Sequence, residues 1–357
     1  MPASGSCRDP ARRWPRRLSR TGWRSRSHNG WNPRRTSVSC DVNDARRAEV
    51  LRSIEPLVAG LARQHEAKAE EWWPSAELPR AYLPEDAGRL AEMQRRSKGI
   101  PPAVRACLAL NIVTEEGLPL FHQALTNMLP AASAFLSWAH RWTAEEDRHG
   151  HVMRDYASLT GIVDEIALDR MQFAFLRNGW DDGWDGDPFR VFVYTSLQER
   201  ATQIAHQQTA AIAGQYEPVL GGFLKTVARD EARHYAFYRA VFAGVLDADV
   251  DDALESAAAI MPLMAMPGGS MPQYRDLAET ASRAGIYTLR HYHDLVQELI
   301  RFWAIGNRTP STDRGRAARD RIMGIPARLT KIADRMEAAR TARAFQFEVA
   351  FGHEFTL

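Results

Sequence analysis

The sequence lacks several features that would mark other classes of protein. Its 357 residues contain no run of 18 or more apolar residues, so it predicts no transmembrane helix. The only three cysteines, Cys7, Cys40 and Cys107, are too scattered for a disulfide framework or a cysteine zinc site. A formal net charge of +2 gives no argument for nucleic acid as a partner. We therefore expect a protein of a reducing compartment, the cytoplasm of a bacterium.

Residues 1–40 differ in composition from the rest of the chain. They contain ten arginines, one acidic residue (Asp9) and many Ser, Pro and Gly, without hydrophobic periodicity. Such a segment buries too little apolar surface to offset the entropy cost of ordering, so we expect a disordered Arg-rich extension. Its origin has three explanations: a transit peptide to the plastid stroma, a basic arm for an acidic partner, or a wrongly chosen start codon. We favour the last, because its tryptophans show no amphipathic pattern.

From residue 41 to 357 we expect a single helical domain. Apolar residues recur at spacings of three and four, while alternating strand patterns are almost absent. The segments Asp181–Pro188 and Met266–Met271 are rich in Gly, Pro and Asp or Ser and predict loops. The predicted helices are 44–70, 102–128, 132–158, 163–178, 188–214, 217–246, 274–305 and 312–342. This pattern predicts an all-α fold with a four-helix bundle at its core and additional helices around it.

Two predicted helices contain the same short motif, Glu-x-x-His. The first copy is Glu146 with His149, and the second is Glu231 with His234. A spacing of three places both side chains of a copy on one helical face. A single copy is weak evidence, since it occurs by chance on many solvated helices. Two copies, each within an apolar stripe, indicate a buried polar site.

Two further glutamates complete a pattern that is typical of a two-metal site. Glu115 lies on the helix before Glu146, and Glu199 lies on the helix before Glu231, at separations of 31 and 32 residues. Bundles that hold two metal ions use one Glu from each of two helices and Glu-x-x-His from the other two. Four buried carboxylates would repel one another, whereas two divalent cations would balance their charge. Oxygen-rich ligands with one His per metal favour iron or manganese over zinc.

Two residues near these glutamates leave alternatives open. Pro119 follows Glu115 by one turn and cannot donate to its carbonyl, so the chain has either a kink beside the site or a helix end. Thr202 lies in a polar stripe with Thr195, Glu199 and His206. Its hydroxyl either faces oxygen or water at the site or bonds to a carbonyl of its own helix.

The motifs resemble those of the soluble acyl-acyl-carrier-protein desaturases of plant plastids and actinobacteria. The resemblance covers roughly residues 50–357. The strings that carry it are Thr114–Pro119 (TEEGLP), Trp142–Gly150 (WTAEEDRHG), Thr195–Thr202 (TSLQERAT) and Asp230–His234 (DEARH), with weaker support from Trp72–Pro74, Leu78–Pro79, Gly285–Thr288 and Ile325–Leu329.

The resemblance implies a fold, a site and partners. The fold would be a ferritin-like homodimer, and the ligands of two iron ions would be Glu115, Glu146, His149, Glu199, Glu231 and His234. Asp230 and Trp72 match positions on a proposed electron route, and Thr202 matches an oxygen-handling threonine. The implied reaction is the O₂-dependent desaturation of an acyl chain on acyl carrier protein, in fatty acid biosynthesis, with electrons from reduced ferredoxin.

Other classes remain as alternatives at this point. One is another ferritin-like di-iron oxidase, such as a hydroxylase, an N-oxygenase or a ribonucleotide reductase small subunit. A ferroxidase is a further alternative, although ferritins are much shorter chains. The segments Gly179–Pro188 and Pro267–Tyr274 fit the plant pattern poorly. Asp147 replaces a different small polar residue of the plant motif, which should not affect the site because Asp147 is not among the expected ligands. The acyl chain length and the position of the double bond therefore stay unassigned.

Overall fold

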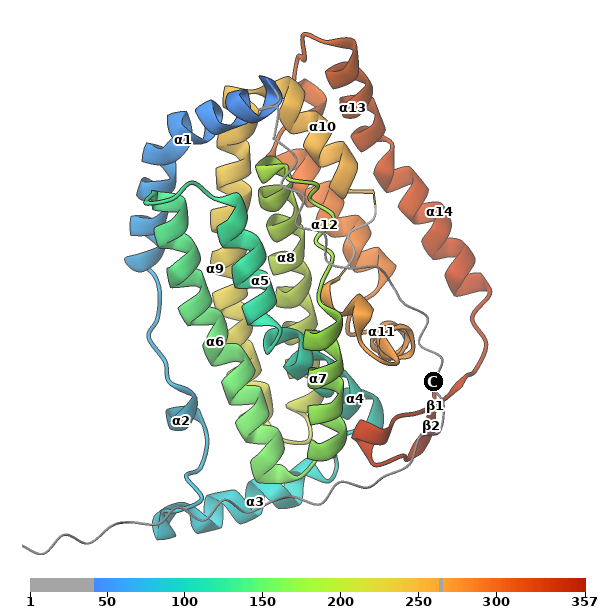
Figure 1. The fold of residues 1–357 in the computed structure, drawn as a ribbon. Helices are drawn as coiled ribbons and strands as arrows, with labels where there is room; N and C mark the ends of the chain where they lie inside the picture. Colours follow the sequence, from blue (N-terminus) through green and yellow to red (C-terminus); the bar gives the residue numbers. More distant parts are fainter. Residues whose placement is uncertain (1–41, 263–265) are drawn as a thin grey trace, which may run out of the picture. The chain divides into compact units, whose positions relative to one another are not determined.

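The computed structural model describes residues 42–262 and 266–357, so the predicted extension at residues 1–40 lies outside the described residues. Val42–Leu357 forms one compact unit. Within the described ranges the chain forms fourteen α-helices, four short 3₁₀ helices and one two-stranded sheet (Figure 1). None of these helices combines the length and the apolar character needed to cross a membrane.

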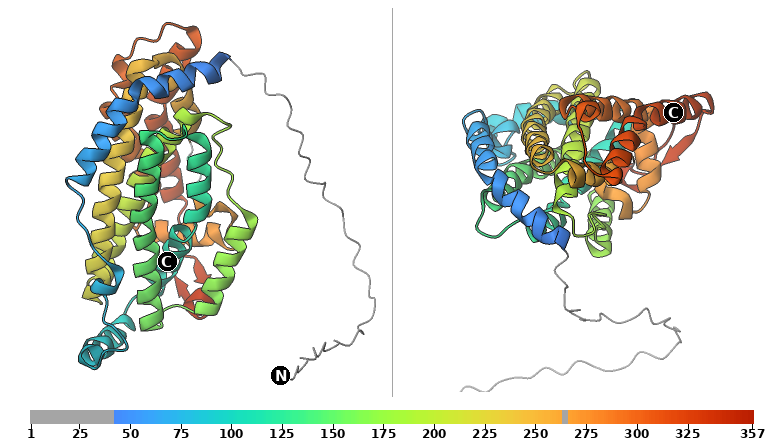
Figure 2. Two further views of the ribbon diagram at one scale, coloured as in Figure 1. Left: turned by 60° about the vertical axis from the view of Figure 1, so that its left-hand side comes forward. Right: turned by 90° about the horizontal axis from the view of Figure 1, so that it is seen from above.

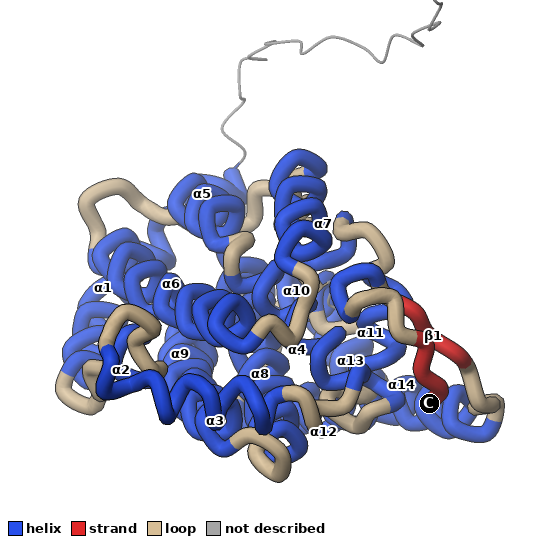
Figure 3. Tube along the Cα trace, turned by 90° about the horizontal axis from the view of Figure 1, so that it is seen from below, coloured by secondary structure: helices blue, strands red, loops and turns tan. Residues whose placement is uncertain are grey.

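Four long helices form a bundle. They are α4 (Pro102–Glu115), α6 (Ala134–Thr160), α8 (Pro188–Ala213) and α9 (Pro218–Ala248). Each packs against two others, in the order α4, α6, α9, α8 and back to α4. The view along the bundle shows the remaining helices around this core (Figure 3). The predicted all-α fold with a four-helix bundle is confirmed.

Side chains and prolines at the helix starts explain where the bundle helices begin. The Ser133 hydroxyl accepts a hydrogen bond from Leu136 N at the start of α6. The Asp187 carboxylate caps α8, and the Glu217 carboxylate caps α9 by accepting from Leu220 N at 2.7 Å. Proline is the first residue of both α8 and α9, where no backbone N–H is needed.

The other elements cover the bundle on several sides (Figure 2). Helix α1 packs on α6 and α9, α5 on α6 and α8, α7 and α11 on α4, and α10 and α12 on α8. Their bounds are α1 Val42–Glu66, α2 Pro74–Glu77, α3 Ala87–Ser97, α5 Leu118–Met128, α7 Glu165–Asn178, α10 Val250–Ile260, α11 Tyr274–Arg283, α12 Leu289–Phe302, α13 Asp313–Met323 and α14 Ile325–Ala338. The 3₁₀ helices are η1 Pro84–Asp86, η2 Pro267–Ser270, η3 Ile305–Asn307 and η4 Glu348–Ala350, and strands β1 Ala344–Gln346 and β2 Glu354–Thr356 pair antiparallel.

The prediction of one helix over 102–128 is wrong, because the chain forms two helices there. Helix α4 ends at Glu115 and α5 begins at Leu118. Pro119 cannot donate to the Glu115 carbonyl, and it occupies the first turn of α5, where its missing N–H costs nothing. Gly117 is required at the break, since a Cβ there would lie 2.5 Å from Phe175 Cε1. Of the two alternatives at Pro119, the helix end is the one observed.

Two other predicted helices are also divided. The segment 274–305 forms α11 and α12, separated at Gly285, whose φ of +75° interrupts a right-handed helix. The segment 312–342 forms α13 and α14, with Gly324 between them. The sequence prediction missed α3, α10 and the short sheet. Helix α10 has a periodic apolar face with Ala253, Leu254 and Ala257 buried, so its pattern was available in the sequence. The predicted loop at Asp181–Pro188 joins α7 to α8, with Pro188 as the first residue of α8.

Candidate metal centre

A polar layer interrupts the apolar core of the bundle. On one side of this layer the core contains Trp142, Leu197 and Tyr238, and on the other it contains Met153, Ala210 and Val227. The buried polar side chains between them include those of both Glu-x-x-His motifs. Burying this many ionisable groups together is costly unless they are paired or hold a metal, so the layer calls for a functional explanation.

The six side chains singled out in the sequence meet in this layer. Their possible ligand atoms form two groups, each with all atoms within 4.8 Å of one another. The first group is Glu115, Glu146, His149 and Glu231, and the second is Glu146, Glu199, Glu231 and His234. Glu146 and Glu231, the glutamates of the two Glu-x-x-His motifs, belong to both groups. The arrangement therefore suits two adjacent metal ions that share two carboxylates.

Several possible ligand atoms of these groups are buried without a hydrogen-bond partner, as expected of atoms that bind a metal ion. Glu199 Oε2 and both Glu231 carboxylate oxygens are buried and have no hydrogen-bond partner in the protein. Glu146 Oε1 lies 2.7 Å from His234 Nδ1, within the same group of possible ligands. Buried polar atoms are normally hydrogen-bonded, so a group of orphaned ones at a single point indicates a missing charge partner. Carboxylate oxygens with one imidazole per group suit iron or manganese. The residues present fit two such ions.

Burial and mutual charge shift the pKa values of this cluster strongly. Burial raises the pKa of Glu115 to about 7, and the carboxylates of Glu146 and Glu231 act in the same direction. Burial and the Glu146 charge hold the pKa of Glu199 well above its usual range. Burial alone would lower the pKa of His149, but the neighbouring carboxylates outweigh it and raise that pKa well above normal. Without metal the cluster therefore retains protons that bound cations would replace.

The outer nitrogen of His149 faces an acidic and aromatic network. His149 Nε2 lies 3.4 Å from Asp230 Oδ2, and Trp72 Nε1 donates to the same oxygen at 2.7 Å. The Trp72 ring is parallel to His149, with an interplanar angle of 6° and centroids 6.2 Å apart. Arg148 donates to Asp230 and lies over the Trp72 ring. The structure thus places Asp230 and Trp72, the two residues to which the family resemblance pointed, beside the candidate centre.

The outer nitrogen of His234 faces a second network, which the sequence reasoning missed. Glu145 Oε2 lies 2.9 Å from His234 Nε2 and 2.9 Å from His65 Nε2, and Arg141 donates to the other Glu145 oxygen. Glu145 directly precedes Glu146, as Asp230 directly precedes Glu231, and this repeat in the sequence was a usable signal. His65 lies on α1, 80 residues before Glu145, and no local pattern points to it.

Two further polar contacts involve the single glutamates. His206 Nε2 lies 3.1 Å from Glu115 Oε1, and Trp142 Nε1 donates to Glu199 Oε1 at 3.1 Å. The Thr202 hydroxyl donates to the Gln198 and Glu199 carbonyls of its own helix, each at 3.1 Å. Of the two alternatives for Thr202, the bond within the helix is therefore the one observed, although the residue lines a cavity together with Glu115.

Two cavities flank the polar layer along α8. The α4–α11 cavity, of about 100 Å³, reaches Glu115 and Thr202; it is lined by Cys107, Leu110, Asn111, Thr114, Glu115, Ala201, Thr202, Ala205, His206, Met266, Tyr274, Ala278, Ala281, Ile286 and Tyr287. The aromatic cavity, of about 20 Å³, lies on the side of Thr195 and Gln198; it is lined by Phe121, Leu125, Trp142, Trp180, Trp184, Tyr194, Thr195, Gln198 and Pro267. Both are mainly apolar, so the candidate centre lies between two spaces suited to hydrocarbon.

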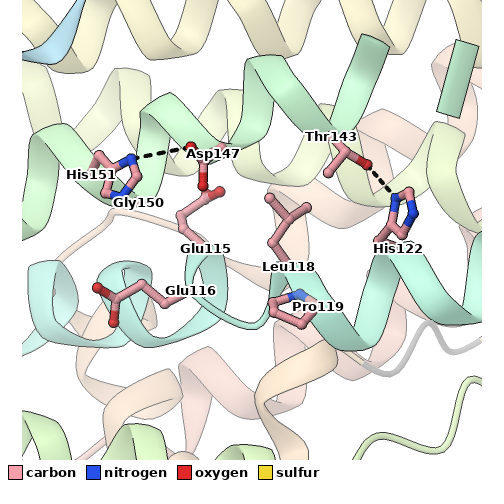
Figure 4. A pocket seen from close by; sticks show the side chains of 9 residues that line it. All are labelled: Glu115, Glu116, Leu118, Pro119, His122, Thr143, Asp147, Gly150 and His151. Carbon is pink, nitrogen blue, oxygen red and sulfur yellow. Dashed lines mark hydrogen bonds and ion pairs between the residues drawn. The ribbon is translucent and has the colours of Figure 1, made fainter. Parts of the chain in front are cut away.

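An open cleft of about 400 Å³ lies at the break between α4 and α5 (Figure 4). Figure 4 shows the Glu115 side chain pointing toward α6, whereas the Glu116 side chain extends sideways from the break. Glu116 forms an ion pair with Arg154, with oxygens 2.5 and 2.8 Å from the guanidinium. A Cβ on Gly150 would lie 3.5 Å from Glu115 Cβ, so this glycine lets α6 approach α4 closely.

Comparison with a solved structure shows the same fold. The X-ray structure of DesA2 from Mycobacterium tuberculosis H37Rv superposes with a TM-score of 0.52 and 21% sequence identity. The match covers 73% of this chain and 96% of that chain. The bundle with its additional helices is thus the ferritin-like arrangement that the sequence predicted.

Comparison with known sequences identifies the family. The chain is 32% identical over 315 residues to acyl-[acyl-carrier-protein] desaturase 3, chloroplastic, of Oryza sativa subsp. indica, covering 83% of this chain and 78% of the relative. It is 31% identical to stearoyl-[acyl-carrier-protein] 9-desaturase 6, chloroplastic, of Arabidopsis thaliana, covering 80% and 77%, and 30% identical to acyl-[acyl-carrier-protein] 6-desaturase of Thunbergia alata, covering 82% and 80%. The family profile described as fatty acid desaturase matches residues 46–351. The chain therefore belongs to the fatty acid desaturase family, and it is an oxidoreductase of that family.

Proposed function

We propose that this chain is an O₂-dependent acyl-[acyl-carrier-protein] desaturase that uses two iron ions. In this reaction two adjacent methylenes each lose one hydrogen atom and become joined by a double bond. O₂ takes up these two hydrogen atoms together with two electrons and two protons, and two water molecules form. The observation that carries the proposal is the pair of overlapping donor groups that share Glu146 and Glu231, in a chain of the desaturase family. The names of the relatives support an acyl chain on acyl carrier protein as the substrate.

The proposed ligand set assigns each ion its own carboxylate and imidazole. Glu115 and His149 would hold one ion, Glu199 and His234 would hold the other, and Glu146 and Glu231 would bridge them. When bound, the two ions supply the redox chemistry with O₂ that breaks an unactivated C–H bond, which no side chain acid or base achieves. The four carboxylates balance the charge of two divalent cations.

The carboxylates around the centre would orient the two imidazoles. Asp230 and Glu145 lie against the Nε2 atoms of His149 and His234, so each Nε2–H has an acceptor outside the cluster. This arrangement leaves the two Nδ1 atoms facing the shared glutamates. Such carboxylate–imidazole pairs set the tautomer and raise the basicity of a ligand histidine.

Trp72 would connect the centre to an electron donor. The chain of contacts from His149 through Asp230 to Trp72 is continuous, and Arg148 covers the Trp72 ring. We propose reduced ferredoxin as the donor, and Thr202, which lines the α4–α11 cavity, as a residue that contacts oxygen or water during turnover.

The two cavities would hold the acyl chain across the metal centre. Their walls are mainly apolar, and together they extend to both sides of Glu199 along α8. If the cavities hold one carbon pair beside the ions, the loss of motional freedom is met by binding, and the activation barrier of the reaction falls. The relatives include a 9-desaturase and a 6-desaturase, so family membership alone does not assign the position of the double bond.

We further propose a homodimer in the bacterial cytoplasm, or in the plastid stroma if residues 1–40 serve as a transit peptide. The chloroplastic relatives support the second location.

Turnover of the iron-loaded protein tests the proposed function. The assay supplies acyl carrier protein loaded with chains of different lengths, reduced ferredoxin and O₂, and detects products by mass spectrometry. An alkene is expected from at least one chain length. Alcohols in place of alkenes would indicate a hydroxylase, and iron oxidation without any change in the acyl chain would indicate a ferroxidase. Either result would overturn the desaturase assignment.

A further inference from the structure

Three buried polar atoms of residues that line the α4–α11 cavity have no hydrogen-bond partner in the protein. One is Nδ1 of His206, a residue whose Nε2 lies against Glu115 of the metal centre. The other two lie away from the proposed metal ligands: Asn111 Nδ2, on α4, and the Tyr287 hydroxyl, in the segment between α11 and α12. The rest of this wall is mainly apolar, with Leu110, Ala205 and Ile286 among the lining residues. Buried polar atoms normally have hydrogen-bond partners, so several unpartnered ones at one mainly apolar cavity indicate a ligand that completes their hydrogen bonds.

The chemistry of these atoms restricts the group that they would bind. The Asn111 amide nitrogen is a donor only, and the Tyr287 hydroxyl has a proton to donate. Their ligand must therefore present an acceptor, such as a carbonyl oxygen. A saturated acyl chain has no acceptor along its hydrocarbon, and the carbonyl oxygens of a carrier-bound substrate are those of its thioester and of the amides in the tether.

We propose that Asn111 and Tyr287 hydrogen-bond to the thioester or tether carbonyls of the substrate. This proposal rests on the proposed function, because it takes the substrate to be an acyl chain on a pantetheine-type tether. The carbonyl end then lies in the α4–α11 cavity, and the hydrocarbon continues past Glu115 and Thr202 toward the aromatic cavity. Anchoring the carbonyl sets which carbon pair reaches the metal centre.

The aromatic cavity is unsuited to the tether. Its volume of about 20 Å³ accommodates little more than one small group. Trp184 Nε1 is also without a hydrogen-bond partner, but the Trp184 ring is in T-shaped contact with the rings of Trp180 and Tyr194. This narrow aromatic end fits the methyl terminus of the chain.

Cys107, which also lines the α4–α11 cavity, does not compete for the thioester. Burial raises the pKa of its thiol to about 12, so the thiol stays neutral and is a poor nucleophile. The cavity therefore offers the thioester hydrogen-bond donors, and its cysteine does not present a thiolate.

Asn111→Leu and Tyr287→Phe in the full chain test this inference. Binding is measured by calorimetry with two probes, a ten-carbon acyl-pantetheine thioester and n-decane. We expect each variant to bind the thioester about 3- to 10-fold more weakly than the unsubstituted protein does, the loss of one neutral hydrogen bond. Affinity for n-decane should stay the same. The melting temperature should not fall, because neither atom has a protein partner to lose.

Tyr156→Phe is the matched control, since it removes a hydroxyl from a buried tyrosine that lines neither cavity; thioester binding should not change. Absence of thioester binding by the unsubstituted protein, or equal thioester affinity in all variants, would overturn the inference. The proposed function is judged separately, by whether the unsubstituted protein forms an alkene. Where it does, the two variants should also yield a broader set of double-bond positions.

Discussion

The Glu145 carboxylate lies 2.9 Å from Nε2 of His234, although the two residues are 89 positions apart in the chain. The Asp230 carboxylate stands in the same relation to His149, and each of these acids directly precedes a glutamate of the cluster. Each Glu-x-x-His helix thus contributes the carboxylate that orients the histidine of the other helix. The two motifs therefore depend on each other, and damage to one should weaken both metal positions.

Glu145→Gln should weaken iron binding without removing a ligand. The neutral amide lacks the negative charge that makes the Glu145 carboxylate a strong acceptor for the His234 N–H. Loss of such a partner typically lowers metal affinity about 10- to 100-fold. The affinity is measured by anaerobic titration with Fe²⁺. Asp147→Asn, two residues further along α6 and exposed, is the matched control and should bind iron normally. Equal affinity in both variants would contradict the orienting role of Glu145.

His149→Ala and Glu199→Ala should lower the number of iron ions bound per chain. Each substitution removes a proposed ligand of a different ion, so each variant should retain fewer than two ions after gel filtration. Iron content is measured by a colorimetric assay on the purified protein. His151→Ala, which alters a mainly exposed histidine two positions after His149, should leave the content unchanged. Full loading of the His149 or Glu199 variant would refute the ligand assignment.

Metal binding should weaken as the pH falls. The pKa of Glu115 is about 7, and those of Glu199, His149 and His234 are raised well above their usual values. Ions bind the deprotonated forms, so protons compete increasingly below pH 7, and each proton released changes the apparent Kd about tenfold per pH unit. Titration with Mn²⁺ at pH 6 and pH 8 avoids oxidation. Equal Kd values at pH 6 and pH 8 would contradict the claim that the metal-free cluster retains protons that the ions displace.

Trp72→Phe should slow the delivery of electrons while leaving the metal site filled. The phenyl ring preserves an aromatic group beside His149 but loses the N–H that donates to Asp230 at 2.7 Å. We expect unchanged iron content and slower reduction by ferredoxin in stopped-flow measurements. Trp73→Phe, at the exposed neighbouring tryptophan, is the control. A normal reduction rate in the Trp72 variant would remove this residue from the electron route.

Gly117→Ala should destabilise the break between α4 and α5. The added Cβ would lie 2.5 Å from Phe175 Cε1 and 2.9 Å from the Thr114 carbonyl oxygen. Such overpacking typically costs about 1–3 kcal/mol of unfolding free energy, which denaturant titration measures. Gly88→Ala on α3, where a Cβ meets nothing within 4 Å, should leave the stability unchanged or slightly higher. A Gly117 variant as stable as the Gly88 variant would contradict the close packing at the break.

The sequence by itself determined the helical class, the bundle helices except for the end of α4, and the six polar residues that meet between these helices. This was possible because helical periodicity is local: a spacing of three places Glu146 and His149 on one face wherever the helix lies. The repeated order of Glu and Glu-x-x-His then made a common site the simplest arrangement. The division of predicted helices at Gly117, Gly285 and Gly324 was less accessible, because short breaks hardly alter the apolar pattern on either side.

Only the tertiary structure decided how these residues are shared and supported. The pattern along the chain does not distinguish the shared Glu146 and Glu231 from Glu115 and Glu199, because sharing depends on how far each helix face lies from both groups. The contact between His65 and Glu145 joins segments 80 residues apart, and the orphaned atoms of Asn111 and Tyr287 meet at one cavity only after α11 packs on α4. Such relationships arise from packing between distant elements, and local sequence patterns carry no record of them.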